Sequence, residues 1–534
     1  MDSLSLHLVR SIHDPVHGSI KLSNLEMQVI EHPLFSRLHN VRQNSFLYKV
    51  FPSAKHTRFE HSIGVMHMAH KMLTAAIENG GIAEQRGDIV RDEESLNQLL
   101  CNHQGVALNL YASNVDVLKR AFKELRLAAL LHDIGHGPLS HLFDAFAPTC
   151  DQFKEILRAT PGRDSSDILE SIEKMVDGFL DREVAKGRGR LEARVEHEHV
   201  SSYFAYRILS KIGADEATIR NVLTILKREL ELGKLDVTIH RTEFDMLPLL
   251  SELVASAPID CDRMDYLKRD SYFVGVPYGD YSEDRVLKTL LPYAASDKKL
   301  HLGLKQSGLH AVENFLQARY ELYVQVYGHK TNEAANAILE FASAGNLEFA
   351  DWSGIDLSNS NPGINLADEF EKLYTRLSDE SFLDTVINRI DLDKTQALED
   401  LKARKLWKRI YEVEEFIEHG QRSNVEAAFE AEFATMNDLY PDIMNFIGDR
   451  FPLKDVGSGA KLMEKSSQTV YVVSDKELSV ASQIIRSLNR GLRVRRIYSV
   501  GQHSPAVLKE YVRNQVDPVV QEAIRRDEST RNTQ

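Results

Sequence analysis

The stretch that most constrains this chain is "LLHDIGHGPLSH" at residues 130–141, where three histidines and an aspartate follow a run of leucines. Leu125, Ala128 and His132 stand at i, i+3 and i+7, so they share one face of a predicted helix. His132 therefore continues a buried stripe, and Asp133 follows it directly. Burying a carboxylate without a partner is costly. The stretch predicts either a capped and satisfied helix end or a metal site.

Two glycines and a proline interrupt the helix just after this point. Gly135 and Gly137, with the proline that follows, predict its end, and Ser140 to Phe146 can form a shorter helix. We expect the glycines to free the backbone so that His136 and His141 turn back towards the same place.

A second inward histidine belongs to an earlier predicted helix, Phe59 to Ile77. His61 stands on its apolar face, with Val65 and Met68 at i+4 and i+7. Periodicity predicts further helices at Val200–Ile212, Ala217–Leu230 and Ala311–Ala344. The chain is therefore expected to be mainly α-helical.

Composition places the chain among ordinary globular proteins. It has 534 residues, 43% of them hydrophobic, and 65 basic against 79 acidic side chains, a net charge of −14. An acidic chain is a poor general binder of nucleic acid, although a local basic pocket can still hold phosphates. The three cysteines show no paired spacing, and no apolar run reaches the roughly 20 residues of a membrane helix. We expect a cytoplasmic protein without a membrane partner.

Composition shifts along the chain predict its organisation. Residues 79–120 and 148–195 are polar and charged, so they are interpreted as insertions that form lids over a helical core. Residues 352–366 are rich in Gly, Ser, Asn and Pro and predict a linker. Beyond them, strand-like segments at 469–475 and 492–500 flank a helix-like segment at 476–489. These segments predict a small α/β appendage.

Four places offer imidazole or carboxylate groups where a predicted helix faces inward: "HTRFEHS" (56–62), "HDIGHG" (132–137), "EHEH" (196–199) and "IDCDRMDY" (259–266). A lone inward histidine is most often a hydrogen-bonded core residue, and "EHEH" taken alone fits a solvated charge run. Several such groups buried together favour a divalent cation. Imidazole and carboxylate together suit Mn, Fe, Ni or Zn, and carboxylate-rich sites also accept Mg.

In this order, the pattern H…HD…D resembles the HD-domain metal-dependent phosphohydrolases. The resemblance narrows to the deoxynucleoside triphosphate (dNTP) triphosphohydrolases, particularly to the HD core of members that also carry a sterile-alpha-motif domain. It rests on the motifs "IHDPVHGSIKL", "VFPSAKHTRFEHSIGV", "ALLHDIGHGPLSHLFD", "EHEHVSSYF" and "IDCDRMDYLKRD" and covers roughly residues 10–345.

This resemblance implies a mainly α fold, an HD-domain helical core with a small α/β C-terminal appendage. Residues 1–54 would form an N-terminal segment of the core and a surface for oligomerisation or allosteric control. Residues 55–350 would form the phosphohydrolase core with insertions near 79–120 and 148–195. Residues 351–534 would form the C-terminal helical and α/β region.

The implied reaction is hydrolysis of a dNTP at the α-phosphorus, which releases a deoxynucleoside and intact triphosphate. The metal ligands of the family fall on His61, His132, Asp133 and Asp262. The metal would be Mn, Fe or Mg, with Ni or Zn as further options. The catalytic positions fall on His197, Asp144 and His136, with His197 at the entrance of its helix as the acid that protonates the leaving 5′-oxygen.

The same resemblance assigns the substrate contacts. They fall on Gln43, Arg58, His141, Arg263, Tyr266, Lys268, Asp270, Arg319 and Tyr327. A tyrosine ring pressed under C2′ leaves no space for a hydroxyl, and we carry this role to Tyr327. The alternative reading of Arg319, Tyr323 and Tyr327, at i, i+4 and i+8, is an aromatic packing stripe.

Regulated members of the family bind an activating guanine nucleotide at a separate site and form oligomers. We expect a homo-oligomer, a dimer or a tetramer, and the matching allosteric positions are Arg10, Asp14 and Glu31. Ser36 and His39 depart from the pattern of that site. Nearer the C-terminus, a cluster of arginines either holds a nucleotide or a subunit or is simply solvated: Arg486, Arg490, Arg493, Arg495 and Arg496.

Two alternatives stay open at this point. The first keeps the metal but makes the protein a nuclease or phosphodiesterase acting on single-stranded nucleic acid or on a nucleotide messenger. The second is a non-catalytic oligomer that senses a nucleotide in the same pocket.

Overall fold

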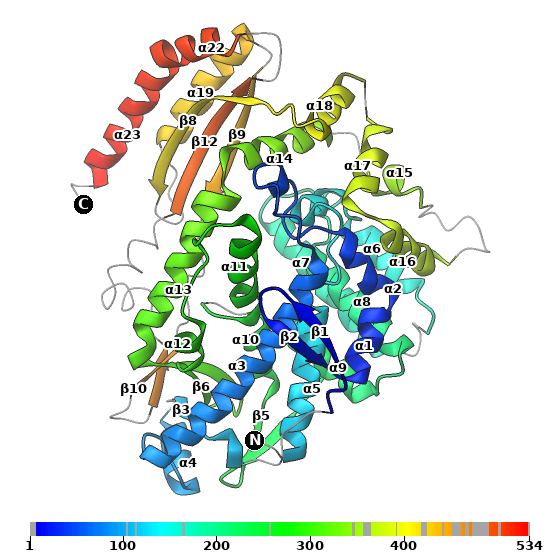
Figure 1. Ribbon diagram of the computed structural model, residues 1–534, viewed down its shortest axis with the longest axis vertical. Coiled ribbons are helices and arrows are strands. Elements are labelled where there is room, and N and C mark those ends of the chain that lie inside the picture. Colours follow the sequence, from blue (N-terminus) through cyan, green and yellow to red (C-terminus); the bar gives the residue numbers. More distant parts are fainter. Residues whose placement is uncertain are drawn as a thin grey trace.

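A computed structural model gives the fold of the chain (Figure 1). It describes every residue except 1–6, 103–104, 113–114, 163–165, 256–257, 344–347, 356–364, 391, 418–423, 441–442, 451–460, 465–468, 473–490, 500–503 and 532–534. Helices dominate, and the sheets are small, so the expected mainly α fold is confirmed. Most of the predicted linker at 352–366 and the predicted helix at 476–489 lie outside the described residues.

The helix α3 (Arg58–Arg86) is the centre of the core. A capping box between Thr57 and Glu60 starts it, and Gly87 ends it in a left-handed conformation, with φ 75°. It packs against α5 (Val115–Leu131) and α11 (Cys261–Val274). Because α3, α5 and α11 bring together three of the inward-facing motifs, this packing creates the site.

The second predicted insertion belongs to the core. Residues 148–195 form α6 (Cys150–Arg158) and α7 (Asp167–Ala185). The helix α7 buries Ile172, Val176 and Leu180 and packs against α8 (His197–Lys211). Polar residues on the outer face of α7 hid this apolar stripe in the average composition. Within the first insertion, residues 79–120, α3 continues, α4 (Glu93–Cys101) and β3 (Gly105–Ala107) follow, and α5 begins.

The other core elements complete the description. Up to residue 300 they are β1 (Arg10–Asp14), β2 (Gly18–Leu22), α1 (Asn24–Glu31), α2 (Pro33–Ser36), η2 (Arg37–Asn40), η3 (Leu47–Lys49), η4 (Leu110–Ala112), η5 (Ser140–Phe146), α9 (Glu216–Leu226), η7 (Arg228–Leu230), β4 (Asp236–Ile239), β5 (Thr242–Asp245), α10 (Leu247–Val254), α12 (Glu283–Leu287) and β6 (Leu290–Ala294). Then come β7 (Leu300–Lys305), η8 (Gln306–Gly308), α13 (Leu309–Leu322), η9 (Tyr323–Tyr327), α14 (Lys330–Ser343), α15 (Phe349–Ser353), α16 (Leu366–Arg376), α17 (Asp379–Ile387) and α18 (Leu392–Lys402).

The single helix expected over Ala311–Ala344 is broken in the middle. One wide π turn, η9, follows α13, and Gly328 separates it from α14. Such turns are frequent at functional sites because they re-aim side chains within a helix. The break changes which residues of this segment share a face.

The C-terminal appendage is an antiparallel sheet in the order β8-β12-β9, built from β8 (Lys408–Ile417), β12 (Gly491–Ser499) and β9 (Ile443–Arg450). The helices α19 (Asn424–Leu439), α22 (Pro505–Tyr511) and α23 (Asp517–Arg531), with the π turn η10 (Val512–Val516), share one apolar cluster with this sheet. Figure 1 shows the appendage at one end of the molecule, next to α14.

The predicted strand at 469–475 does not join this appendage. It forms β11 (Thr469–Val472), which pairs with β10 (Lys461–Glu464) and with β3 of the core, where Thr469 faces Val106. The five strands β10-β11-β3-β6-β7 close on themselves. The prediction placed both strands in one appendage because they are close in sequence, whereas β11 pairs with strands that lie far from it in the chain.

Arginines of the appendage are buried in β12. Arg495 pairs with Glu415 at 3.0 Å, and Arg496 pairs with Glu412 and donates to the carbonyl of Gly328 at 3.2 Å. Tyr498 donates to the carbonyl of Lys330 at 3.0 Å. Of the predicted arginine cluster, Arg486 and Arg490 lie outside the described residues. Arg496, together with Tyr498, ties the appendage to the start of α14, and neither Arg495 nor Arg496 is solvated.

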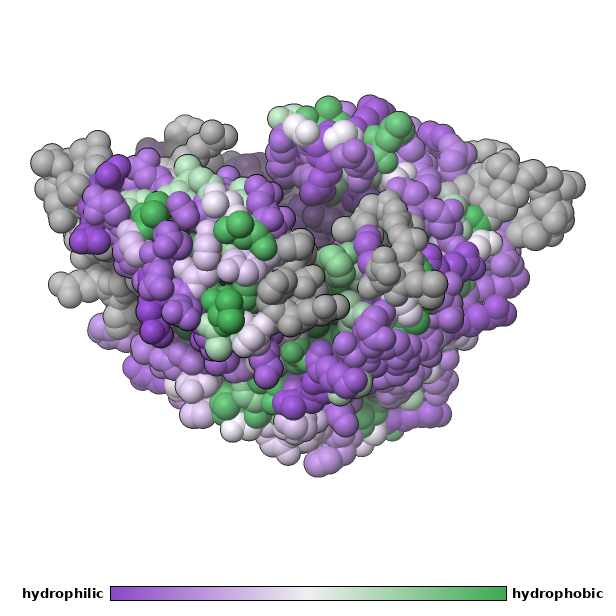
Figure 2. Space-filling model, turned by 90° about the horizontal axis from the view of Figure 1, so that it is seen from above, coloured by the Kyte–Doolittle hydropathy of each residue, from purple (hydrophilic) through white to green (hydrophobic). Residues whose placement is uncertain are grey.

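The molecular surface is mainly polar on the face that Figure 2 presents, with hydrophobic side chains in small, separate groups. Within the described ranges, the helices are all too short or too polar to cross a membrane.

A buried ion pair fixes the first strands and helix to the core. Arg126 on α5 and Glu26 on α1, each 2% exposed in the side chain, form a two-pronged contact at 2.6 and 2.9 Å. Arg126 also donates to the carbonyl of Lys21 at 2.8 Å. These donors leave the Glu26 carboxylate fully paired.

We predict that Arg126→Met destabilises the protein by about 3–5 kcal/mol, because it leaves a buried carboxylate without its cation. Urea denaturation measures the change. Lys174→Met, which breaks the exposed Glu170–Lys174 pair, is the matched control and should cost less than about 1 kcal/mol. Equal losses for the two variants would contradict the role given to Arg126.

Candidate metal centre and active site

The four predicted metal ligands converge between α3, the end of α5 and the start of α11. His61 Nε2 lies 3.1 Å from an Asp262 oxygen and 3.6 Å from an Asp133 oxygen. His132 Nε2 lies 3.4 Å from Asp133 and 3.7 Å from Asp262. Two imidazoles and two carboxylates thus present donor atoms to one point, as the ligands of a divalent cation do.

The other ring nitrogen of each histidine, Nδ1, contacts the protein and fixes the orientation of the ring. His61 Nδ1 lies 2.8 Å from Asp265, and His132 Nδ1 lies 2.8 Å from the carbonyl of Ala129. Metal-binding histidines commonly use one ring nitrogen in this way. Both Nε2 atoms are buried and have no hydrogen-bond partner in the described part of the chain. The residues therefore fit a divalent metal.

A second layer of charge holds Asp265 in place. Arg269 contacts both of its oxygens, at 2.8 and 3.0 Å, and His17 Nε2 lies 2.6 Å from it. Arg269 in turn pairs with Asp14 at 2.7 Å. Asp14, predicted as an allosteric position, is therefore buried behind the metal centre. The two other positions of that prediction, Arg10 and Glu31, form an exposed pair at 3.6 Å.

The electrostatics of the cluster are those of a cation site. Burial opposes charge on His61, yet the carboxylates of Asp262 and Asp265 raise its pKa to about 9. Burial also opposes ionisation of Asp133, but Arg58 and His132 hold its pKa well below the usual range. The carboxylates therefore stay ionised and attract positive charge. This charge comes from a bound metal or from protonation of His61.

The local backbone explains how "HDIGHGPLSH" folds. Neither glycine needs a left-handed conformation; each allows a close approach instead. A Cβ on Gly135 would stand 2.1 Å from the carbonyl oxygen of His197, and one on Gly137 would stand 2.1 Å from the ring of Phe143. The left-handed residues are Leu139 and Ser140, with φ 59° and 58°. The glycines therefore admit α8 and an aromatic ring, which differs from the expected turn-making role.

Hydrogen bonds compensate the strain of the left-handed pair. Asp379 accepts from the amide of Leu139 at 2.7 Å, and Ser45 donates to the carbonyl of Leu139 at 2.8 Å. Ser140 donates to the carbonyl of Gln43 at 3.1 Å. Because of these contacts, η5 starts at Ser140, as predicted, and presents His141 and Asp144.

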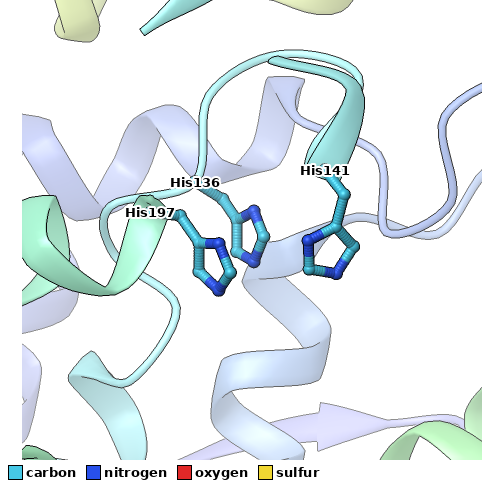
Figure 3. A group of neighbouring side chains, drawn as sticks. All are labelled: His136, His141 and His197. Atoms are coloured by element: carbon cyan, nitrogen blue, oxygen red, sulfur yellow. The ribbon is translucent and has the colours of Figure 1, made fainter. Parts of the chain in front are cut away.

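Three histidines form a second cluster beside the metal centre. Figure 3 shows His136 from the loop, His141 from η5 and His197 from the first turn of α8 with their rings close together. His136 stacks on His197 at 3.6 Å between ring centres, and His141 lies 5.1 Å from His197. Asp144 lies 3.7 Å from both His141 and His197. His197 begins α8, where the sequence placed it.

The members of this cluster differ in environment. His136 is buried 3.4 Å from Asp133, and burial together with Arg58 lowers its pKa well below the usual value, so it is neutral. The His197 side chain is 14% exposed, and that of His141 is 71% exposed. Although burial opposes it, His141 and His197 lower the pKa of Asp144. The cluster thus pairs an ionised carboxylate with two accessible imidazoles.

Both clusters border one pocket of about 470 Å³, a size that suits a small-molecule ligand. It is lined by most of the predicted residues: Gln43, Arg58, Asp133, His136, His141, His197, Asp262, Arg263, Tyr266, Asp270, Arg319 and Tyr327. Lys268 does not line it and pairs with Glu283 instead. His61, His132 and Asp144 stand behind the lining.

Arg319 is the pocket's most available cation. It is 9% exposed, and its Nε and Nη1 atoms have no hydrogen-bond partner among the residues described. Its guanidinium lies 5.6 Å from the ring centre of Tyr323. By contrast, Arg58 contacts Asp133 and Arg263 contacts Asp260. A buried guanidinium with free donors indicates an anionic ligand.

Tyr327, which the π turn places in the pocket wall, donates to Asp270, and His56 lies 2.6 Å from the other oxygen of that carboxylate. The tyrosine is therefore held by the pocket and does not belong to a simple packing stripe.

Sequence reasoning missed two groups of residues. The first is the support of the metal ligands, His17 and Asp265; Asp265 stood inside a quoted motif, three residues after Asp262. The second is Asn332, Glu333 and Asn336 on α14, which line the pocket. In the sequence these residues are visible only as polar positions on one face of an otherwise apolar helix. The fold is needed to show that this face lines the pocket.

The four converging side chains could hold a metal, and the fold and the sequence are similar to those of several known proteins. No family model matches the chain. The chain is 25% identical over 515 residues to an uncharacterized protein of Methanocaldococcus jannaschii, covering 95% of this chain and 82% of that one. A crystal structure of a hypothetical protein from Aquifex aeolicus shares the fold, with a TM-score of 0.54 and 23% identity, covering 96% of this chain and all of that one.

Relatives with a named activity are also similar to this chain. It is 24% identical over 420 residues to the deoxynucleoside triphosphate triphosphohydrolase SAMHD1 of Gallus gallus, and 23% identical over 411 residues to that of Homo sapiens. These matches cover 76% of this chain, but only 57% and 55% of the two relatives. The similarity is consistent with an HD-domain dNTPase-like family, as the motifs indicated.

We predict that Asp265→Asn weakens Mn²⁺ binding about 10- to 100-fold, because His61 loses the carboxylate that orients it. Isothermal titration calorimetry on the metal-depleted protein measures the affinity. Asp284→Asn, at an exposed position of α12, is the control and should leave it unchanged. A folded Asp265→Asn protein with unaltered affinity would contradict this orienting role.

Proposed function

We propose that this protein is a metal-dependent dNTP triphosphohydrolase, which hydrolyses a dNTP at the α-phosphorus to a deoxynucleoside and triphosphate. One observation carries the proposal: two histidines and two aspartates that could hold a metal, a histidine–aspartate cluster and a buried arginine with free donors border one pocket. The names of the SAMHD1 relatives support the same substrate class.

The metal site would bind the α-phosphoryl group at which hydrolysis occurs. His61, His132, Asp133 and Asp262 would bind the cation, and their mixed nitrogen and oxygen donors suit Mn, Fe or Mg, with Ni or Zn as further options. A bound divalent metal supplies Lewis acidity to a phosphoryl oxygen and lowers the pKa of water. Asp265 and the Ala129 carbonyl keep the two imidazoles aimed at it.

His197 would supply the proton that the leaving 5′-oxygen needs. Asp144 faces its Nδ1 at 3.7 Å, which leaves Nε2 as the ring nitrogen that would face the leaving oxygen. Neutral His136 stacks against the same ring and restricts its rotation. His141 shares Asp144 but is largely exposed, so it would contact the ligand at the pocket mouth.

The cationic side chains of the pocket would pair with the roughly four negative charges of a triphosphate. Arg319 has donors to spare, and Arg263 lines the same wall. Arg58 would orient Asp133 as well as face the phosphates. Tyr327, anchored on Asp270, would form the platform for the sugar and exclude a 2′-hydroxyl, with Gln43 and Tyr266 beside it.

We place the enzyme in the cytoplasm because its three cysteines show no paired spacing. The resemblance supports two further parts of the proposal: a homo-oligomer, and Arg10, Asp14 and Glu31 as predicted positions for a nucleotide activator. Asp14 would act there only through Arg269, since it is buried.

We predict that the protein with Mn²⁺ or Mg²⁺ converts dNTPs to deoxynucleosides and intact triphosphate, and turns over ribonucleoside triphosphates much more slowly. Anion-exchange chromatography of the products tests this. Release of mononucleotides from single-stranded DNA would instead support a nuclease. Absence of turnover with every metal and nucleotide would favour a nucleotide sensor.

We predict that His197→Ala retains metal but lowers kcat by about 10²- to 10⁴-fold, because the leaving oxygen loses its acid. Asp133→Ala should lose the metal itself. His310→Ala, at an exposed position of α13, is the matched control. A His197→Ala enzyme with normal turnover would show that another group protonates the leaving oxygen.

A further inference from the structure

The first turns of α14 form a polar wall of the pocket that none of the proposed chemistry uses. The pocket is lined here by Asn332, Glu333 and Asn336, and the first of them comes five residues after Tyr327 in the chain. At i, i+1 and i+4 they can face one ligand together. The remaining question is what such a wall binds.

Asn332 presents an acceptor to the pocket. Its Nδ2 donates to the carbonyl of Tyr327 at 2.9 Å, which fixes the direction of the amide and leaves Oδ1 free. The residue is 8% exposed, and within the described structure this Oδ1 has no hydrogen-bond partner. Asn336 Oδ1 is likewise buried and without a partner there. Buried acceptors of this kind are costly unless a ligand pairs with them.

Glu333 adds a carboxyl group between the two asparagines. Burial raises its pKa to about 7, with Arg496 opposing the rise and Glu340 adding to it. Above that pH the ionised carboxylate is an acceptor only. The wall is then rich in acceptors.

The position of this wall relative to the metal suits a nucleobase. Asp262, a metal ligand, and Asp270 stand eight residues apart on α11, which corresponds to about 12 Å along the helix. Tyr327 contacts Asp270, and α14 starts three residues after Tyr327. The acceptors therefore lie beyond the proposed sugar platform, where the base of a bound dNTP would be.

We propose that Asn332, Glu333 and Asn336 read the nucleobase and favour bases that carry an exocyclic amino group. Adenine, cytosine and guanine each present an N–H₂ donor on the edge that pairs in DNA, whereas thymine presents two carbonyl oxygens around a single N–H. Those oxygens would face the acceptors of α14 without hydrogen bonds. The proposal deepens the proposed function and rests on it for the orientation of the nucleotide.

Binding of the four deoxynucleosides at pH 8, measured by calorimetry, tests the proposal without any turnover. We expect deoxyadenosine, deoxycytidine and deoxyguanosine to bind about tenfold more tightly than thymidine, the effect of roughly one hydrogen bond. Competition among the four dNTPs should give the same order of kcat/KM. Equal affinities, or no binding at all, would overturn the proposal.

Variants assign the effect to α14. Glu333→Gln replaces an acceptor by an amide that can also donate to thymine, so the preference should fall to about threefold or less. Asn336→Ala should also reduce the preference over thymidine. Thermal unfolding shows whether each variant is folded, and Asn336→Ala replaces Glu333→Gln in the test if the latter does not fold. Asp284→Asn, an acid-to-amide change at an exposed position of α12, is the matched control and should keep the full preference. An unchanged preference in both pocket variants would contradict the assignment.

The two proposals can fail separately. Preferential deoxynucleoside binding without release of triphosphate would refute the hydrolase and keep the base recognition. Release of triphosphate from all four dNTPs at equal kcat/KM would keep the hydrolase and refute the base recognition.

Discussion

The placing of buried Asp133 and half-buried Asp262 opposite His61 and His132 is the constraint on which the rest of the structure depends. Two neighbouring carboxylates need compensating charge, and the surrounding elements supply it. Arg58 covers Asp133 from one side, while the imidazoles face both carboxylates. The arrangement is stable only while α3, α5 and α11 keep their packing. A divalent cation would be coordinated by all four side chains together. This would explain why charged residues stand at these ends of the helices.

The pocket beyond this centre is built by parts of the chain that lie far apart in sequence. Asp379 on α17 holds the left-handed turn that presents the histidine cluster. Arg496 and Tyr498 of β12 hold the backbone on either side of the link between η9 and α14. The C-terminal appendage thus supports the wall that we propose reads the base, and its buried arginines have a structural task.

Motif and periodicity were enough to predict the mainly α fold, the place of His197 at the entrance of α8 and the span of η5, because local patterns set those features. They were not enough for β11, whose partners β3 and β10 are determined by long-range pairing. They also missed the apolar stripe of α7, since an average over a polar segment conceals one buried face.

The sequence by itself indicated which groups could bind a metal. Residue type and helical phase pointed to His61, His132 and Asp133, and the resemblance to the HD-domain family supplied Asp262. Only the tertiary structure decided how each is held, because the support comes from Asp265, Arg269 and backbone carbonyls whose roles no local pattern reveals. The same holds for the pocket. The resemblance supplied Arg319 and Tyr327, but only the fold shows that Asn332 and Glu333 line the same pocket, since side-chain direction depends on the packing of whole helices.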